Sequence, residues 1–242
     1  MRPRELRTAA RALRRAASTV ADVGAAAAGA GGLELRAPDR ERALDRYQAV
    51  AGGYDVLTLS GDAYRQRAVD RLALGDGEVV LDVGCGTGRN LPALSRAVGP
   101  RGRVIGIELC PAMAQRARER AEALAGVTVV AAPAEEAGLP VVADAALLCA
   151  THDILRSPPA LANVVRHVRP GGRIVAGGPK WAPWWRPGAA ALNLWTWQVN
   201  RPYVTTFAGF DRPWSGLEDL LGDVEVEEVL YGGGFIAAGT RP

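Results

Sequence analysis

The sequence predicts an α/β fold with a mostly parallel sheet, and three observations lead to this prediction. Short apolar runs alternate with longer helical stretches from residue 78 onward, at the spacing of β-α-β units. A glycine-rich loop follows the first apolar run, as in α/β proteins that bind a ligand at the strand ends. Two strand-like runs flank residues 231–234 near the C-terminus and predict a terminal antiparallel hairpin.

The strands and helices follow from the local patterns in chain order. A helical pattern over residues 39–74 starts at the capping residue Asp39 and is interrupted at Gly52-Gly53, with a second helix expected around 61–73. Continuous apolar runs are typical of strands that are buried on both faces. The expected strands are residues 78–84, 103–109, 127–132, 143–150 and 172–178. The expected helices between them are residues 89–98, 111–125 and 158–168, with Pro111 in a first turn.

The composition divides the chain into three expected parts. Residues 1–36 are a basic N-terminal arm with an Ala/Gly linker, residues 37–75 a helical lid, and residues 76–242 an α/β domain with a tryptophan-rich insert at 179–215. No run of about 18 uncharged apolar residues occurs, so we expect no membrane span. The basic start lacks the strongly apolar core of a secretory signal, so we expect a cytoplasmic protein.

The positive charge is concentrated in the arm. Residues 1–36 contain seven arginines and three acidic residues, whereas the remainder is close to neutral. This distribution argues against a broad nucleic-acid surface. Two interpretations of the arm stay open: an amphipathic helix that makes peripheral membrane contact through residues 1–20, or a short surface helix or disordered start.

The three cysteines match no zinc or disulfide spacing. Cys85, Cys110 and Cys149 lie within or just beyond apolar runs, so we expect buried free thiols and no metal site.

The clearest chemical motif is "VVLDVGCGTGRN" at residues 79–90. The first strand ends in Asp82 and is followed by Gly84, Gly86 and Gly88, which let the chain turn sharply and let a ligand approach the backbone. A dinucleotide fingerprint has its third glycine one position later. The second strand ends in Glu108, within "IGIEL", where a carboxylate can accept both hydroxyls of a ribose.

This combination resembles the class I S-adenosylmethionine-dependent methyltransferases over roughly residues 40–180. The likeness is closest to the ubiquinone/menaquinone C-methyltransferase-like and phospholipid N-methyltransferase-like branch. "VAGGYDVLT" (50–58) resembles the stretch before the sheet in that branch, and "HVRPGGRIV" (167–175) resembles its lead-in to the fifth strand. The resemblance implies a Rossmann-like fold, a seven-stranded sheet, an N-terminal helical lid and S-adenosylmethionine as cofactor.

The resemblance also implies roles for individual residues. The glycine loop would make room for the cofactor, Asp82 would steady the loop and the cationic amino group, and Glu108 would bind the ribose. The family's adenine-reading acid is replaced by Pro133, within "APAEE", so adenine would rely on the backbone near Ala134 and on apolar neighbours. The expected cofactor-binding residues are Tyr54, Asp82, Gly84, Cys85, Gly86, Gly88, Glu108, Leu109, Ala134 and, less directly, Glu135.

The reacting side of the site is expected at "CATHDIL" (149–155), after the fourth strand. His152 and Asp153 are the candidate catalytic pair there, and His can act as a base near neutral pH. A capping or cofactor-contacting role for His152 stays open. His167 precedes a Pro-Gly-Gly turn at a helix end and is expected to be structural.

The insert contains "WAPWWRPGAAALNLWTW" (181–197), with five of the six tryptophans. In the resembled branch, the acceptor site closes at this position. The expected substrate contacts are Trp181, Trp184 and Trp185, with Trp195 and Trp197 in the same wall, and Lys180 or Arg186 facing an anionic group. The alternative is that about half of this indole is core, with a helix only over residues 188–199.

Three functions remain from the sequence. The first is S-adenosylmethionine-dependent methyl transfer to a hydrophobic or amphiphilic small molecule, such as a natural product, quinone-like molecule or lipid. The second is phospholipid N-methylation at a membrane. The third is a non-catalytic protein that binds S-adenosylmethionine. Nothing in the sequence indicates the acceptor atom or the oligomeric state.

Overall fold

The computed structural model describes residues 38–57, 62–139 and 141–242. The predicted basic arm and its membrane contact lie outside the described residues. Among the helices of the described part, none combines the length and the apolar character needed to cross a bilayer.

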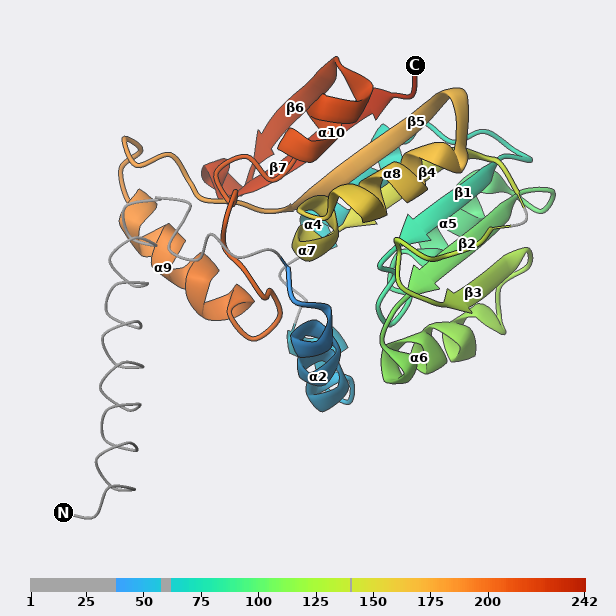
Figure 1. Cartoon of the computed structure of the whole chain (residues 1–242), viewed down its shortest axis with the longest axis horizontal. Coiled ribbons are helices and arrows are strands. Elements are labelled where there is room, and N and C mark those ends of the chain that lie inside the picture. The colour runs from blue at the N-terminus through green and yellow to red at the C-terminus, as the bar shows by residue number, and fades with distance from the viewer. Residues whose placement is uncertain (1–37, 58–61, 140) are drawn as a thin grey trace, which may run out of the picture.

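Within the described residues, seven strands form one sheet at the centre of the molecule (Figure 1). The strand order is β3-β2-β1-β4-β5-β7-β6, with parallel pairs from β3 to β5 and antiparallel pairs at β5-β7 and β7-β6. The predicted mostly parallel sheet with a terminal antiparallel hairpin is therefore confirmed. The strands are β1 (Val79–Val83), β2 (Arg103–Glu108), β3 (Val127–Ala131), β4 (Ala143–Cys149), β5 (Val168–Pro179), β6 (Val224–Val229) and β7 (Gly234–Thr240).

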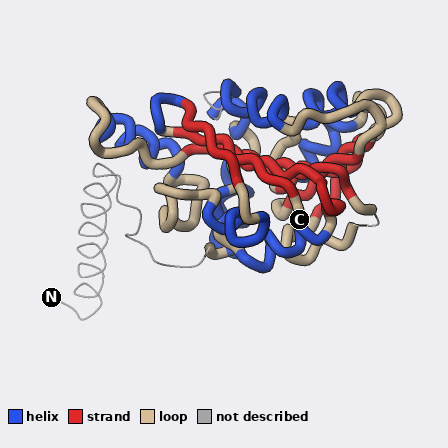
Figure 2. Tube along the Cα trace, turned by 90° about the horizontal axis from the view of Figure 1, so that it is seen from above, coloured by secondary structure: helices blue, strands red, loops and turns tan. Residues whose placement is uncertain are grey.

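Helices cover both faces of the sheet, which Figure 2 shows edge-on. The longer helices lie within a few residues of the predicted ones, whereas the short helices α3, α7 and α10 were not predicted. The helices are α2 (Arg40–Val50), α3 (Tyr54–Leu57), α4 (Asp62–Arg71), α5 (Leu91–Val98), α6 (Pro111–Ala121), α7 (His152–Leu155), α8 (Pro158–Arg166), α9 (Ala189–Asn200) and α10 (Ser215–Leu221).

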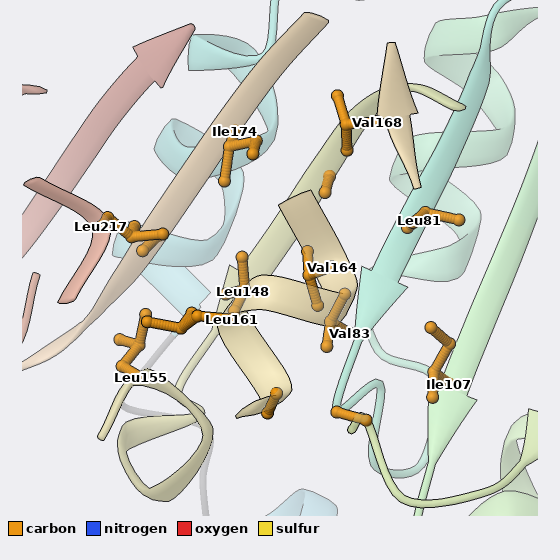
Figure 3. Packing of buried hydrophobic residues seen from close by; sticks show 14 of the residues in the cluster. Leu81, Val83, Ile107, Leu148, Leu155, Leu161, Val164, Val168, Ile174 and Leu217 are labelled. Carbon is orange, nitrogen blue, oxygen red and sulfur yellow. The ribbon is translucent and has the colours of Figure 1, made fainter. Parts of the chain in front are cut away.

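The core has two layers, one on each side of the sheet. Successive side chains of a strand point to opposite faces, so Leu81 and Val83 join one apolar cluster and Val80 joins the other. Figure 3 shows the first layer, where Leu161 and Val164 of α8 face the strands. Burial on both sides explains the continuous apolar run that predicted β1.

The predicted lid of residues 37–75 divides in the structure. Helix α4 packs in the second core layer through Ala68 and Val69, so it belongs to the α/β domain rather than to a lid. Helix α2 instead joins a small cluster around Cys110 and Met113, just beyond the end of β2. Among the described residues of this range, α2 and α3 are the helices that lie over the strand ends without joining the two core layers.

Candidate cofactor and acceptor site

The glycine loop after β1 requires its glycines. Gly84, Gly86 and Gly88 all have positive φ values, of 66°, 58° and 81°. A Cβ atom on Gly84 would lie 2.6 Å from Thr151 Cγ2, and one on Gly88 would lie 2.7 Å from Leu91 Cδ1. Gly84 therefore keeps the loop close to the end of β4, and Gly88 lets it pack on the neighbouring helices.

Glu108, the last residue of β2, is held rigidly against this loop. Its Oε2 accepts a hydrogen bond from the Gly86 N–H at 2.9 Å, and its Oε1 accepts one from the Cys110 N–H at 2.7 Å. The side chain is buried, and burial raises the pKa of Glu108 despite these hydrogen bonds. The result is a fixed carboxylate at the glycine loop, which suits hydroxyl groups as hydrogen-bond donors.

Asp82 lies beneath the loop and is fully buried. Its Oδ1 accepts a hydrogen bond from Asn90 Nδ2 at 3.1 Å, whereas its buried Oδ2 has no partner among the described residues. Burial raises the pKa of Asp82 to about 6. An unpaired buried carboxylate oxygen is costly, so this atom is a candidate for binding a cationic or hydrogen-donating ligand group.

A cavity of about 170 Å³ opens over the loop and Glu108. Asp82 and Gly88 support the loop without lining this cavity. The other predicted cofactor residues do line it, namely Tyr54, Gly84, Cys85, Gly86, Glu108, Leu109, Ala134 and Glu135.

The part of the cavity lined by Ala134 and Glu135, where adenine is expected, differs from the prediction because both residues have partners within the protein. Glu135 is paired with Arg40 of α2, with 3.2 Å between Oε1 and Nη1, so its carboxylate also ties the lid to this side. The carbonyl of Ala134 accepts a hydrogen bond from buried Asn163 at 2.7 Å. Asn163 was not predicted, because an Asn inside an ordinary apolar helix gives no signal in the sequence.

His152 begins α7 and is buried at the end of β4. Its Nε2 lies 3.1 Å from the carbonyl oxygen of Ala208. A carbonyl can only accept, so Nε2 carries the proton and Nδ1 is an unprotonated acceptor with no partner. Burial lowers the pKa of His152 to about 3, which keeps the ring neutral around pH 7.

Asp153 does not form the expected catalytic pair with His152. Its carboxylate accepts hydrogen bonds from the Thr205 hydroxyl at 2.8 Å and from the Thr205 N–H at 3.0 Å. Burial raises the pKa of Asp153. The Thr205 hydroxyl in turn accepts from the N–H of Asp39, the capping residue of α2, at 3.0 Å. The structure therefore gives Asp153 a positioning role between β4, the insert and the lid.

The lid is also tied to the glycine loop. Asp55 of α3 accepts hydrogen bonds from Arg120 at 2.7 Å and from the Thr87 hydroxyl. The adjacent Tyr54 ring lies edge-on to those of Tyr47 and Tyr203, with ring centroids 6.1 and 5.4 Å apart. Three tyrosines from α2, α3 and the insert thus close over the strand ends.

A second cavity, of about 80 Å³, lies on the other side of these tyrosines. Trp195, Tyr203 and Leu230 line it, together with Tyr64 of α4. The residues that line both cavities are Tyr47, Tyr54, Arg65, Ala150, His152 and Val204. Arg65 was missed by sequence analysis, because arginines recur throughout this helical stretch.

The predicted cationic substrate contacts need correction. Lys180 is buried and donates to Glu228 Oε1 at 2.8 Å. Arg186 donates to the other oxygen of Glu228 at 2.7 Å. Neither side chain lines either cavity, and Glu228 of β6 pairs with both.

The predicted tryptophan wall also needs correction. Trp181 is buried in a separate cluster, stacked on Phe207 with centroids 5.3 Å apart. Trp184 and Trp185 are 74% and 68% exposed and line neither cavity. Trp197 packs against the Trp181 cluster, so Trp195 is the member of the predicted wall that reaches the second cavity.

The comparisons with known proteins agree with this geometry. Residues 80–172 match a family model described as a methyltransferase domain. The match supports a class I S-adenosylmethionine-dependent methyltransferase domain in this region. It contains β1 to β4, the glycine loop and Glu108.

Two curated relatives and one solved structure show the extent of the similarity. A demethylmenaquinone methyltransferase of Staphylococcus aureus (strain JH9) is 34% identical over 146 residues, which are 57% of this chain and 60% of that protein. An uncharacterized 37.1 kDa protein in transposon TN4556 of Streptomyces fradiae is 35% identical over 154 residues, or 62% of this chain and 41% of the relative. The chain thus spans less than two thirds of either relative.

The solved structure is the N-methyltransferase NodS of Bradyrhizobium japonicum WM9 in complex with S-adenosyl-L-homocysteine. It is 19% identical, covers 74% of this chain and 86% of its own, and has a TM-score of 0.54. At this identity the likeness concerns the fold.

The site residues of the methyltransferase domain fit S-adenosylmethionine. The glycine loop leaves open backbone beside the cavity, and a Cβ on Gly86 would point toward Tyr54 Cε1 at 3.9 Å. Glu108 offers a fixed acceptor for ribose hydroxyls, and Asp82 retains an unpaired oxygen that suits an ammonium group. Glu108, the glycine loop and the Tyr54 lid are therefore the residues that would hold this cofactor.

Proposed function

We propose that this chain transfers a methyl group from S-adenosylmethionine to an apolar or amphiphilic small molecule held in the second cavity. The arrangement of two adjoining cavities is the observation that carries the proposal. The cofactor cavity and the second cavity meet at Tyr54, Arg65 and His152. The second cavity is walled by aromatic and aliphatic side chains, which suit an acceptor with an apolar body.

The chain's own residues can position the acceptor and exclude water. When bound, S-adenosylmethionine supplies a methyl group on a sulfonium, and the new bond to the nucleophile forms as the carbon–sulfur bond breaks. The three tyrosines close the space between the cavities, and methyl transfer depends largely on such positioning in a dry site. The Asp153–Thr205 hydrogen bonds hold the wall that carries Val204 and Tyr203.

His152 can act where the nucleophile carries a proton. His152 lines both cavities and its Nδ1 is a buried acceptor, so this nitrogen can accept a hydrogen bond from the nucleophile, and its lowered pKa suits it to take a proton only from a strongly acidic group as the methyl bond forms. An amine that binds in its neutral form does not need this step. His152 is therefore proposed as the general base for acidic acceptors and as a wall residue for the others.

A radiolabel screen tests the proposal. The full chain is incubated with S-adenosylmethionine tritiated in the methyl group and with a panel of demethylated quinones, phenolic polyketides and phosphatidylethanolamine. Transfer to an apolar acceptor is expected, and Trp195→Ala should raise the KM for that acceptor more than the KM for S-adenosylmethionine. The matched control is Trp185→Ala, which lies in the same insert but outside both cavities. Cofactor binding without transfer to any acceptor would favour the non-catalytic alternative.

A lipid acceptor at a membrane is the second candidate, because apolar side chains are exposed around the second cavity. Trp184 and Trp185 are in edge-on contact, and the Arg186 guanidinium lies 5.5 Å from the ring centroid of the exposed Tyr231. The neighbouring Leu230 and Trp195 are exposed and also line the second cavity.

Vesicle co-sedimentation separates the two candidates. Vesicles of phosphatidylcholine with phosphatidylglycerol should retain the full chain at low salt under the membrane hypothesis. The double variant Trp184→Ser/Trp185→Ser should then release it, whereas Val142→Ser, at another exposed apolar residue, should not. A chain that lacks residues 1–36 shows how much the basic arm contributes. Equal recovery of all variants in the supernatant would exclude the membrane hypothesis in favour of a freely diffusing acceptor.

A further inference from the structure

A further cavity, of about 360 Å³, opens between helices α4, α5 and α6. It is distinct from the cofactor cavity, because neither the glycines of the loop nor Glu108 line it. Its lining includes Arg65 of α4, Arg89 just before α5 and Arg120 of α6, and no Asp or Glu among the described residues. Three arginines from three segments therefore meet in one place, which we call the arginine cavity.

The positive charge of this cavity is only partly balanced within the protein. Its three arginines are half-buried, whereas Arg96 of α5 and Arg118 of α6 are exposed. Like charges that are brought together and partly removed from water repel one another, which favours an anion beside them. Asp55 accepts a hydrogen bond from Arg120 at 2.7 Å, and its carbonyl oxygen accepts one from Arg89 at 3.4 Å. One carboxylate offsets one of the three charges, so an excess of positive charge remains.

The rest of the lining also favours an anion. Asn90 and Ala93 line the cavity, so it lies at the N-terminal end of α5, where the helix dipole is positive. Asp70, which accepts a hydrogen bond from Gln66 at 2.8 Å, is exposed and does not line the cavity. Charge and helix orientation thus select the same kind of ligand.

The number of arginines favours a phosphate over a carboxylate. A single guanidinium can satisfy both oxygens of a carboxylate through two parallel hydrogen bonds. A phosphate monoester carries about two negative charges at neutral pH and has three acceptor oxygens, so it can accept from several guanidinium groups at once. We propose that the arginine cavity binds a phosphate group. This site goes beyond the proposed function, and its occupancy does not require methyl transfer.

Two sources can supply the phosphate group. Arg65 and Arg89 also line the cofactor cavity, so the arginine cavity adjoins the space in which methyl transfer is proposed. One source is a free phosphate ion. The other is the phosphate of an acceptor whose apolar body extends past Arg65 into the second cavity.

Phosphorus-31 NMR titrations of the full chain test the proposal, with and without saturating S-adenosylhomocysteine. The probes are inorganic phosphate and 2-naphthyl phosphate, and calorimetry with 2-naphthol measures what the apolar body contributes alone. The test variants are Arg89→Met, Arg89→Lys and Arg120→Met. The controls Arg96→Met and Arg118→Met remove the same charge from α5 and α6 at exposed residues outside the cavity. Constant ionic strength separates a binding site from general electrostatic attraction.

Saturable phosphate binding that depends on the cavity arginines is the expected result. Arg89→Met and Arg120→Met should each weaken the affinity at least about tenfold, because each removes hydrogen bonds to a charged group. Arg89→Lys should lie between, and both control variants should match the wild type. Binding should persist with S-adenosylhomocysteine, because Glu108 and the glycine loop lie outside the arginine cavity.

The two probes identify the source of the phosphate. Tighter binding of 2-naphthyl phosphate than of inorganic phosphate, with this advantage lost in Trp195→Ala, identifies a phosphorylated acceptor that reaches the second cavity. Equal affinities for the two probes identify a free phosphate ion.

The absence of saturable phosphate binding to the wild type would overturn the proposal. Equal affinities in the test and control variants would also overturn it, as would competition between phosphate and S-adenosylhomocysteine, which would place the anion in the cofactor cavity. Thermal denaturation checks that each variant is folded, and variants in two different segments keep the test decisive if one of them does not fold. A chain that binds phosphate but no S-adenosylhomocysteine would instead contradict the proposed function, so the two failures are distinguishable.

Discussion

The Asp153 carboxylate accepts hydrogen bonds from both the N–H and the hydroxyl of Thr205, which lies 52 residues later in the chain. The same hydroxyl accepts from the N–H of Asp39. One buried acid thereby connects the end of β4, the insert and the first residue of the lid. Sequence analysis predicted Asp153 as a catalytic residue beside the acceptor, whereas in the structure its hydrogen bonds connect the segments that surround the cavities.

Replacing Asp153 with Ala should destabilise the fold. It leaves the Thr205 N–H and hydroxyl without their buried acceptor, at a cost of about 1–3 kcal/mol in the free energy of unfolding. Urea denaturation measures this cost. The exposed Asp211 is the matched control, and Asp211→Ala should change the free energy by less than about 0.5 kcal/mol. In a double-mutant cycle with Thr205→Val, additive effects would contradict the coupling.

Cofactor affinity should depend on the ionisation of Asp82. The pKa of the Asp82 carboxyl is about 6, so this group becomes protonated as the pH falls through that value. The neutral carboxyl then attracts the ammonium group of the ligand less strongly than the carboxylate does. The affinity for S-adenosylhomocysteine should therefore rise from pH 5 to pH 7.5, by up to about tenfold per pH unit below the pKa. Calorimetry at several pH values measures it. Asp82→Asn should bind more weakly with a flatter profile, and a wild-type profile that is equally flat would contradict the role of Asp82.

His152 should remain neutral well below its ordinary pKa. Between about pH 3 and 6.5 the unfolded chain binds more protons at this residue than the folded chain, so the free energy of unfolding falls as the pH drops through that window. Nitrogen-15 NMR of the imidazole should show a protonated Nε2, a bare Nδ1 and no titration between pH 5 and 8. Titration near pH 6.5 would show that the ring is not buried as described.

The glycines of the loop should differ in what their substitution damages. Gly84→Ala places a Cβ 2.6 Å from Thr151 Cγ2 at a φ of 66°, so it should lower both stability and cofactor affinity. Gly86→Ala, at a φ of 58°, has its nearest contact at 3.9 Å and should cost only about 1–2 kcal/mol of stability. The added methyl group lies beside the cavity, so the loss of affinity should be the larger effect. Thermal denaturation and calorimetry separate the two, and equal melting temperatures for both variants would contradict the packing at Gly84.

The sheet could be predicted from the sequence because its signals are local. The apolar runs of β1, β2 and β4 are buried on both faces, and the glycine loop and Glu108 follow directly from the ends of β1 and β2. Gly84, Gly86 and Glu108, which these two strand ends place, therefore line one cavity, and their role in cofactor binding stays a prediction.

The remaining site residues depend on contacts between distant segments. Thr205 reaches Asp153 and Asp39, and Glu228 neutralises both Lys180 and Arg186. Spacing along the chain does not reveal such pairings, so Asp153 appeared as a free acid and Lys180 as a free cation. Arg65 was not predicted as a site residue, since only the structure shows that it lines both cavities while Arg67 of the same helix pairs with Glu227 at the surface.

The binding of S-adenosylhomocysteine to the full chain, measured by calorimetry on wild type and Glu108→Gln, tests the central claim most directly. The Gln side chain keeps the size but has one acceptor oxygen in place of two, so it cannot accept both N–H bonds as Glu108 does and offers fewer acceptor sites to the ribose hydroxyls. We expect one ligand per chain, an affinity at least about tenfold weaker in Glu108→Gln, and no change in Glu122→Gln, an exposed glutamate just after α6. Circular dichroism confirms that each variant is folded. A wild-type chain that binds no ligand, or a folded Glu108→Gln variant with unchanged affinity, would contradict the assigned cofactor site.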